Sequence, residues 1–356
     1  MLVGFGTQRP LVTENQGLPG IDPRVVARWL VTLGIEFREP LRFQRIGLGQ
    51  SNLTYRVNDG AGRAWVLRRP PLGQLLASAH DVVREARVMG ALANTDVPVP
   101  QILGFTTNSE SFGAPLALME FVDGLAVDTM SIAETLAPWQ RRSIALSLPR
   151  TLAAVHGIDL AQVGLANLAS HNPYAHRQLK RWSAQWSLSK TRALPEIDEL
   201  TRRLAAAIPE QCEITLVHGD FHLRNLIFSA TTNQVAAVLD WELSTLGDPL
   251  ADMGTLLTYW PEPGETTGGD FAPSTLDGFP DRAEMVRLYL EATGRDPGAL
   301  PYWHVLGLWK LAIICEGVIR RAADEPKNRA AAGIPTVQQI TSVLRKAYEI
   351  ADAAGI

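Results

Sequence analysis

The chain has 356 residues, with 33 Lys and Arg against 37 Asp and Glu, which gives a formal net charge of −4 at pH 7. At roughly 150 residues per domain, this length predicts about two domains or lobes. Nucleic-acid binding depends on an excess of positive charge that displaces counterions from the phosphates, and this chain has no such excess. The charge balance gives no support for a polybasic membrane anchor either. With 46% hydrophobic and 20% charged residues, the composition predicts a folded chain with a sizeable core.

Cysteine usage and the chain's apolar stretches exclude further classes. Cys212 and Cys315 lie far apart and in no metal-ligand spacing, which excludes a disulfide scaffold and favours a reducing compartment. The beginning of the chain lacks the basic and apolar regions of a signal peptide. The longest apolar helical stretch, 305–319, is interrupted by Lys310 and Glu316, which argues against a membrane span. We therefore expect a cytoplasmic monomer or homodimer with neither nucleic acid nor membrane as a partner.

The amino-terminal third predicts a small antiparallel sheet. Residues 1–20 are expected to form a loose arm, after which Asp22 and Pro23 are typical of a helix start. Alternating apolar and polar residues then predict strands over 41–46, 53–57 and 64–69, joined by turns into a meander.

The rest of the chain changes from strand to helix. A helix is predicted over 79–93, with Glu85 as the one charge on its apolar stripe, and a strand over 116–121. Helices are expected over 131–210 and from 282 to the end, with short strands over 214–217, 226–228 and 235–239. We therefore predict an α+β fold with a small N-lobe at 21–123 and a larger, mostly helical C-lobe at 124–356.

The strongest motif begins at His218-Gly219-Asp220 and reads H-G-D-x-x-x-x-N, with Asn225 at its end and Asp240 twenty residues after Asp220. Phosphoryl transfer of the kinase type needs one carboxylate to orient a hydroxyl and receive its proton. It also needs a carboxylate and an amide oxygen to hold magnesium against the nucleotide phosphates. We assign Asp220 as the catalytic base, and Asn225 and Asp240 as the ligands of Mg²⁺. The sequence thus predicts ATP and Mg²⁺ as cofactors.

A glycine-containing turn lies between the first two predicted strands. A strand–turn–strand glycine loop can cover the phosphates of ATP with backbone N–H groups, although a plain hairpin turn would look similar. The predicted nucleotide contacts of this loop are Gly47, Gly49, Gln50, Ser51 and Asn52.

The third predicted strand carries Arg68 and Arg69, whose side chains should face opposite sides because side chains alternate along a strand. Arg68 is in register with the lysine that kinases use to contact phosphate, and Glu85 is its natural partner. Two solvated arginines on an edge strand are the alternative. Glu120 and Val122 resemble a hinge whose backbone would take the adenine edge.

Residues close to the motif are assigned more weakly. His222 and Arg224 are possible contacts of the phosphate or the acceptor, and His156 is interpreted as an ordinary histidine. Asp248 and Asp252 are interpreted as mainly structural, at the start of a helix.

These motifs together resemble the aminoglycoside phosphotransferase and choline kinase-like family. The resemblance rests on His218 to Asn225, on Asp240-Trp241-Glu242 and on the G-D-P-L-A-D segment at 247–252, and it covers about residues 25–350. A narrower likeness, carried by segments such as 66–71 and 310–317, is to the kinase-like amino-terminal domain of acyl-CoA dehydrogenase family members 10 and 11. The wider family has lysine where this chain has Arg68, whereas the narrower branch shows arginine there.

The resemblance implies a protein-kinase-like bilobal fold and ATP- and Mg²⁺-dependent phosphorylation of a small hydroxyl compound, with hydroxy acids or hydroxyacyl-CoA thioesters as plausible acceptors. A nucleotide-binding regulator without turnover, an aminoglycoside O-phosphotransferase and, last, a protein kinase are the alternatives. Lys310 and the arginines near 320 favour an anionic acceptor over a polycationic one. Candidate residues of the acceptor wall are Tyr259, Trp260, Trp303, Trp309, Lys310, Glu316, Arg320 and Arg321.

Overall fold

The computed structural model describes residues 18–47, 52–72, 81–107, 112–324 and 334–356. The chain divides into two compact units, which are described separately here. Unit 1 comprises residues 1–90 and 100–121, and unit 2 comprises residues 91–99 and 122–356.

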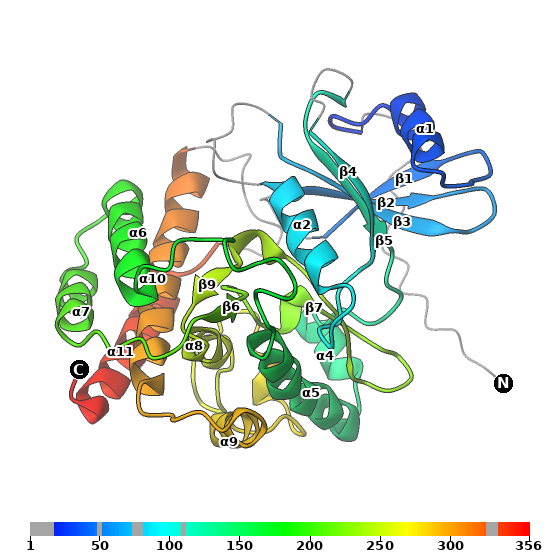
Figure 1. Cartoon of the computed structure of the whole chain (residues 1–356). Helices are drawn as coiled ribbons and strands as arrows, with labels where there is room; N and C mark the ends of the chain where they lie inside the picture. The colour runs from blue at the N-terminus through cyan, green and yellow to red at the C-terminus, as the bar shows by residue number, and fades with distance from the viewer. Residues whose placement is uncertain (1–17, 48–51, 73–80, 108–111, 325–333) are drawn as a thin grey trace. The chain divides into compact units, whose positions relative to one another are not determined.

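Unit 1 is built on a five-stranded antiparallel sheet with the strand order β1-β2-β3-β5-β4 (Figure 1). Its elements are α1 (Pro23–Thr32), β1 (Arg42–Ile46), β2 (Leu53–Asn58), β3 (Ala64–Arg69), α2 (Val82–Leu92), β4 (Ile102–Thr106) and β5 (Leu116–Glu120). Helix α1 begins as its sequence predicts, since the Asp22 carboxylate accepts the Arg24 N–H and Pro23 occupies the first turn.

The two faces of this sheet pack against different helices. On one face, Tyr55, Leu67 and Leu118 pack with Val26 and Leu30 of α1 in a buried cluster. On the other face, the side chains of α2 form a second cluster with residues that include Ala117 of β5. Strand β3 therefore alternates between an α1 face and an α2 face, as a period of two requires.

Unit 2 is mainly helical and contains two short two-stranded sheets, β6 with β9 and β7 with β8. Its helices are α4 (Met130–Thr135), α5 (Pro138–His156), α6 (Tyr174–Ser189), α7 (Pro195–Ala206), α8 (Leu250–Thr258), α9 (Arg282–Thr293), α10 (Leu300–Asp324) and α11 (Val337–Ala354). Its strands and 3-10 helices are β6 (Thr215–Val217), η1 (Leu223–Asn225), β7 (Leu226–Phe228), β8 (Val235–Val238), η2 (Trp241–Leu243), β9 (Thr245–Gly247) and η3 (Pro273–Thr275).

Helix α10 is the central helix of unit 2 and packs against α8 and α11 (Figure 1). The contact with α8 depends on two glycines, because a Cβ at Gly254 would meet the backbone of Trp303 and one at Gly307 would meet the Thr258 hydroxyl. Among the described residues, α10 is the one helix long and apolar enough to cross a membrane, and its apolar stretch is 78% buried within the protein.

The predicted strands over 41–46, 53–57, 64–69 and 116–121 are confirmed to within one residue at their ends. Strands β4 and β9 were not predicted, because the glycine within β4 and the three-residue length of β9 leave little alternation to detect.

Candidate active site

The H-G-D segment leads out of β6 into the short helix η1, and this loop brings Asp220 and Asn225 into contact. The side-chain nitrogen of Asn225 donates to the backbone carbonyl of Asp220 at 2.8 Å and to its carboxylate at 3.0 Å. The Nε2 atom of His222 lies 3.3 Å from the same carboxylate, which is 28% exposed. The loop therefore presents a partly accessible carboxylate whose orientation is set by its neighbours.

The charge state of Asp220 suits a proton acceptor. Burial alone would raise the pKa of this carboxyl, but the hydrogen bond of His222 and the charge of Lys310 hold that pKa below its usual range. Asp220 is consequently ionised at neutral pH. It can accept a hydrogen bond from an incoming hydroxyl and take its proton as the oxygen becomes bonded elsewhere.

His218 connects this loop to the segment that carries Asp240. Its Nε2 lies 2.9 Å from the carbonyl oxygen of Leu239, and its Nδ1 accepts the N–H of Asp220 at 3.2 Å. Since Nδ1 accepts, Nε2 must carry the proton and donate. In addition, the N–H of Leu239 donates to the carbonyl of Asn225 at 2.8 Å. The two predicted metal-ligand positions are thereby tied together through the residue before Asp240.

Asp240 has left-handed backbone angles, with φ 64° and ψ 59°. A non-glycine residue in this region costs on the order of 1 kcal/mol, and such residues are concentrated at functional sites. The following residue, Trp241, is fully buried and anchors the turn by donating its indole N–H to the Val238 carbonyl. The buried indole thereby holds the strained turn in place and fixes the backbone from which the Asp240 carboxylate extends.

The donor set around these residues fits Mg²⁺. Because the amide nitrogen of Asn225 is committed to Asp220, its amide oxygen is the atom left to face a cation. One amide oxygen and one carboxylate are the small set of hard ligands from which Mg²⁺ completes its shell with water and phosphate oxygens. Among the described residues, no cluster of three or more His, Cys, Asp or Glu side chains occurs that could hold a metal ion through protein ligands alone.

Asp252, on α8, holds the loop in place, a role that sequence reasoning missed. Its carboxylate is fully buried and accepts the backbone N–H groups of His218 and Gly219, each at 2.7 Å. Gly219 has φ +83°, and a Cβ there would lie 2.8 Å from the Leu243 carbonyl. The loop thus needs a glycine at this position and an acceptor for two adjacent N–H groups.

His156, interpreted from the sequence as an ordinary histidine, has a structural role, because its side chain supports Asp252. Both its ring nitrogens are engaged, Nε2 with the Asp252 carboxylate at 3.2 Å and Nδ1 with the Tyr289 hydroxyl at 2.7 Å. Burial lowers the pKa of His156, so the ring is neutral, donates from Nε2 and accepts at Nδ1. No local spacing could have revealed this, since the partners lie 96 and 133 residues away.

His222 and Arg224 remain close to the site. The ring of His222 packs against Tyr259 with centroids 4.4 Å apart, while its Nδ1 accepts the Arg224 N–H and caps η1. The Arg224 guanidinium lies 3.9 Å above the ring of Phe271. Whether either side chain contacts a phosphate or an acceptor stays a prediction.

Lys310 is brought to the same loop from α10. Its ammonium donates to the Gly219 carbonyl at 3.0 Å and lies 5.2 Å from the ring of Trp182. Burial lowers the pKa of Lys310, whereas the nearby charge of Asp220 raises it. A cation is therefore held one residue away from the predicted base, on the side of α10 that faces the loop.

Four of the other residues predicted for the acceptor wall are buried and require correction. Trp260 is a core residue, 1% exposed, with its indole N–H bonded to the Pro280 carbonyl. Trp303 and Trp309 are also buried. Glu316 is fully buried and bonded to the Thr191 hydroxyl and to Arg192, so it supports the fold rather than lining an accessible pocket. Apolar aromatic residues at helical spacing are typical of a core, and here that simpler assignment holds.

In unit 1, the predicted pair on the α2 face is present. A guanidinium nitrogen of Arg68 lies 3.0 Å from the Glu85 carboxylate, and the two side chains are 12% and 1% exposed. Arg68 and Arg69 face opposite sides of β3, as predicted. Neither arginine is solvated and β3 is not an edge strand, which contradicts the alternative of two solvated arginines.

The predicted glycine loop connects β1 to β2, which pair with Ile46 opposite Thr54. Gly47 has φ +81°, a conformation that favours glycine, and Asn52 is buried. Gly49, Gln50 and Ser51 lie outside the described residues. Of the predicted hinge, Glu120 is the exposed last residue of β5 in unit 1 and Val122 is the first residue after it in unit 2. A contact of any of these residues with a nucleotide stays a prediction.

Comparison with known proteins shows the family to which the chain is related. Residues 42–300 match the model of the Phosphotransferase enzyme family. The chain is 36% identical over 307 residues to acyl-CoA dehydrogenase family member 10 from Mus musculus, a match that spans 84% of this chain and 28% of that protein. It is also 36% identical over 315 residues to family member 11 from Rattus norvegicus, spanning 86% of this chain and 38% of that one. The chain therefore spans less than two fifths of the length of these relatives.

Among solved structures, a Ralstonia eutropha protein provisionally named an aminoglycoside phosphotransferase is 31% identical, with a TM-score of 0.73. The match covers 94% of this chain and 97% of that one. The α+β fold of the protein-kinase-like class that the sequence predicted is confirmed, as is the likeness to the family members 10 and 11.

Proposed function

The chain belongs to the phosphotransferase enzyme family, and we propose that it transfers the γ-phosphate of ATP to a hydroxyl group of a small anionic metabolite. The observation that carries this proposal is the arrangement of Asp220. Its carboxylate is oriented by Asn225, ionised at neutral pH and partly exposed, with the Lys310 ammonium one residue away.

Each residue has a role that follows from its contacts. Asp220 orients the acceptor hydroxyl and takes its proton while the acceptor oxygen bonds to the γ-phosphorus and ADP departs. Asn225 and Asp240 would hold Mg²⁺, which would supply positive charge against the phosphate oxygens. In unit 1, Arg68 provides a cation for the phosphates, and Glu85 fixes its direction.

The class of acceptor follows from the charges around Lys310. Its ammonium lies close to Arg181, whose charge further lowers the pKa of Lys310. Glu316, the acidic residue of this helix considered for the acceptor wall, is buried and paired with Arg192. The cations Lys310 and Arg181 therefore accompany the Asp220 carboxylate here, and they favour an acceptor that carries a carboxylate or the phosphates of a CoA thioester over a polycationic aminoglycoside. Hydroxy acids and hydroxyacyl-CoA thioesters are thus the acceptors we propose.

The proposal is tested by incubating the protein with ATP and Mg²⁺ and a panel of hydroxy acids, hydroxyacyl-CoA thioesters, choline-like alcohols and aminoglycosides. We expect a phosphomonoester resonance in ³¹P NMR with an anionic acceptor, and none when Mg²⁺ is chelated. ATP binding without product on the whole panel would instead support the regulator without turnover. Absence of both ATP binding and product would overturn the proposal.

The acceptor class is tested separately at Lys310. Lys310→Gln keeps a donor for the Gly219 carbonyl but removes the charge, whereas Lys310→Arg keeps the charge. We expect Lys310→Gln to raise KM for an anionic acceptor by about 10-fold or more and to leave KM for a neutral alcohol within about 2-fold. Equal losses for both kinds of acceptor would show that Lys310 acts on the loop rather than on the acceptor.

A further inference from the structure

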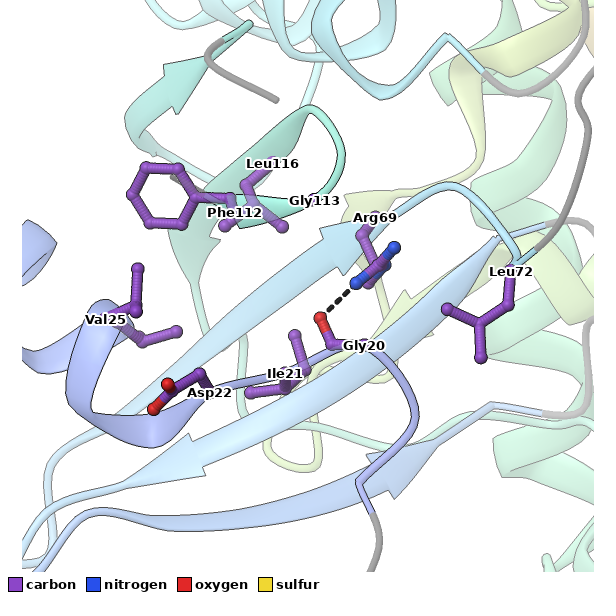
Figure 2. Close-up of a pocket in the computed structure, with 10 residues that line it drawn as sticks. Gly20, Ile21, Asp22, Val25, Arg69, Leu72, Phe112, Gly113 and Leu116 are labelled. Carbon is purple, nitrogen blue, oxygen red and sulfur yellow. Dashed lines mark hydrogen bonds between the residues drawn. The ribbon is translucent and has the colours of Figure 1, made fainter. Parts of the chain in front are cut away.

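Unit 1 contains a pocket of about 490 Å³ on the α1 face of its sheet (Figure 2). It lies between the beginning of α1, the end of β3 and the segment before β5, and its lining includes Gly20, Val25, Arg69, Leu72, Phe112 and Leu116. Pockets that bind small molecules have volumes of roughly 300–1,000 Å³ and combine apolar walls with a few polar anchors. This pocket has that size and that composition.

The polar anchor of the pocket is Arg69, which is 4% exposed. Its Nε donates to the Pro70 carbonyl at 3.2 Å, and its Nη1 donates to the Gly20 carbonyl. Both acceptors are neutral, and Nη2 makes no hydrogen bond within the described part of the chain. Nor does a carboxylate there form an ion pair with Arg69.

Such an arginine is unusual, because buried arginines are almost always paired with a negative charge. Carbonyl oxygens satisfy N–H groups but do not balance the charge. The burial of Arg69 also lowers its pKa, with Tyr55 as its main electrostatic neighbour. The neighbouring Arg68 differs in this respect, because the Glu85 carboxylate balances its charge.

The remaining walls are mostly apolar. Figure 2 shows Val25, Phe112 and Leu116 on one side of Gly20 and Ile21, and Arg69 with Leu72 on the other. The Asp22 carboxylate also lines the pocket, but it already accepts the Arg24 N–H at the start of α1. We propose that this pocket binds a small organic carboxylate, with its anionic group on Arg69 and its hydrocarbon body against the apolar wall.

The proposed ligand has an anionic end and an apolar end, because the pocket has a cation at Arg69 and an apolar wall. A carboxylate offers the guanidinium a planar acceptor and supplies the missing negative charge. Burial of the hydrocarbon body against the apolar wall adds affinity through the hydrophobic effect. The ligand site lies on the face of β3 opposite to Arg68 and does not depend on the proposed phosphotransfer.

The probe for this site is hexanoate, titrated into the whole protein by calorimetry, with hexan-1-ol and hexylammonium as uncharged and cationic controls of matched length. We expect saturable binding of hexanoate alone. Arg69→Gln, which keeps a hydrogen-bond donor but not the charge, should weaken it by about 10-fold or more. Val25→Phe, a change on a half-exposed helix position, should block the pocket with a similar loss while leaving Arg69 intact.

A third variant separates this pocket from the proposed acceptor site. Lys310→Gln would weaken hexanoate binding if the carboxylate occupied the acceptor site, and should leave it within about 2-fold if it binds at Arg69. If Arg69→Gln does not fold, as judged by circular dichroism, Val25→Phe decides the matter. The proposal is overturned if the folded wild-type protein binds no hexanoate up to about 10 mM, or if neither Arg69→Gln nor Val25→Phe weakens the binding.

Discussion

Strand β3 in unit 1 and the loop at 218–225 in unit 2 both carry functional charges, but they position them differently. In β3, Arg68 and Arg69 are adjacent in sequence and are sent to opposite faces of a sheet by the alternation of the strand alone. In the loop, Asp220 is held by Asn225 and, through the backbone of the preceding residues, by the side chains of Asp252 and Lys310, which are distant in sequence.

This difference decides how each region responds to mutation. An arginine of β3 can be changed while the paired backbone on both sides keeps the strand in register. The loop has no such ladder, and its shape depends on a few buried acceptors such as the Asp252 carboxylate. We therefore expect changes in the loop to lower kcat and stability together. Changes in β3 should weaken the binding of individual ligands, with a loss of stability only where a buried ion pair such as Arg68–Glu85 is broken.

The largest effect is expected at the base itself. Asp220→Asn keeps the shape of the side chain but removes its charge and its ability to take a proton, so kcat should fall by about 1,000-fold or more. ATP affinity, measured by calorimetry, should stay within about 3-fold. Asp248→Asn, a matched change of a buried aspartate on the same unit, should leave kcat within about 2-fold. Comparable rates for the two variants would contradict the assignment of Asp220.

The next largest effect is expected where the loop is anchored. Asp252→Asn replaces a two-oxygen acceptor with a group that has one oxygen, so one of the N–H groups of His218 and Gly219 loses its partner in a buried place. We expect a loss of about 2–4 kcal/mol in the free energy of unfolding, together with a fall in kcat of about 100-fold. His156→Gln should show a smaller loss of stability, because the Asp252 carboxylate keeps both backbone bonds.

The same difference between local and distant contacts determines which features of the structure the sequence predicts. The strands of unit 1, the opposed directions of Arg68 and Arg69, the Arg68–Glu85 pair and the closeness of Asp220 to Asn225 were all predicted, because each rests on a local period or a short spacing. Apart from the Arg68–Glu85 pair, which joins β3 to the helix that follows it, each involves neighbours within one strand or one loop.

The support of the loop could not be predicted in this way. Asp252 and His156 act through contacts that span 33 to 133 residues, and only the fold brings them together. The prediction that Trp260 lines the acceptor wall was wrong for a different reason. A large aromatic residue near a site was taken for a pocket wall, while burial of its apolar area against the core is the stronger driving force.

A moderate effect is expected at Arg68. Arg68→Met leaves the buried Glu85 carboxylate without its cation, and we expect KM for ATP to rise by about 10-fold, with a loss of stability of about 3 kcal/mol. Arg68→Lys keeps the charge but not the forked geometry, and its KM should stay within about 3-fold of wild type. If both variants behave like wild type toward ATP, Arg68 contacts no phosphate and the arginines of β3 differ only in their structural partners.

The smallest effect is expected at Asp248, and its sign is set by pH. Burial raises the pKa of this carboxyl from its ordinary 3.8 to about 6. The folded state therefore binds a proton that the unfolded state has already released, so the carboxyl penalises folding increasingly as pH rises from about 4 to 6, and constantly above that. Asp248→Asn keeps the side-chain oxygen that accepts the Leu250 N–H, so removing the charge should stabilise the protein. Urea unfolding should show a gain about 1–2 kcal/mol larger at pH 8 than at pH 5. A gain that is equal at both pH values would mean that the carboxyl is ionised at both, and that its burial is relieved by a contact other than the Leu250 N–H.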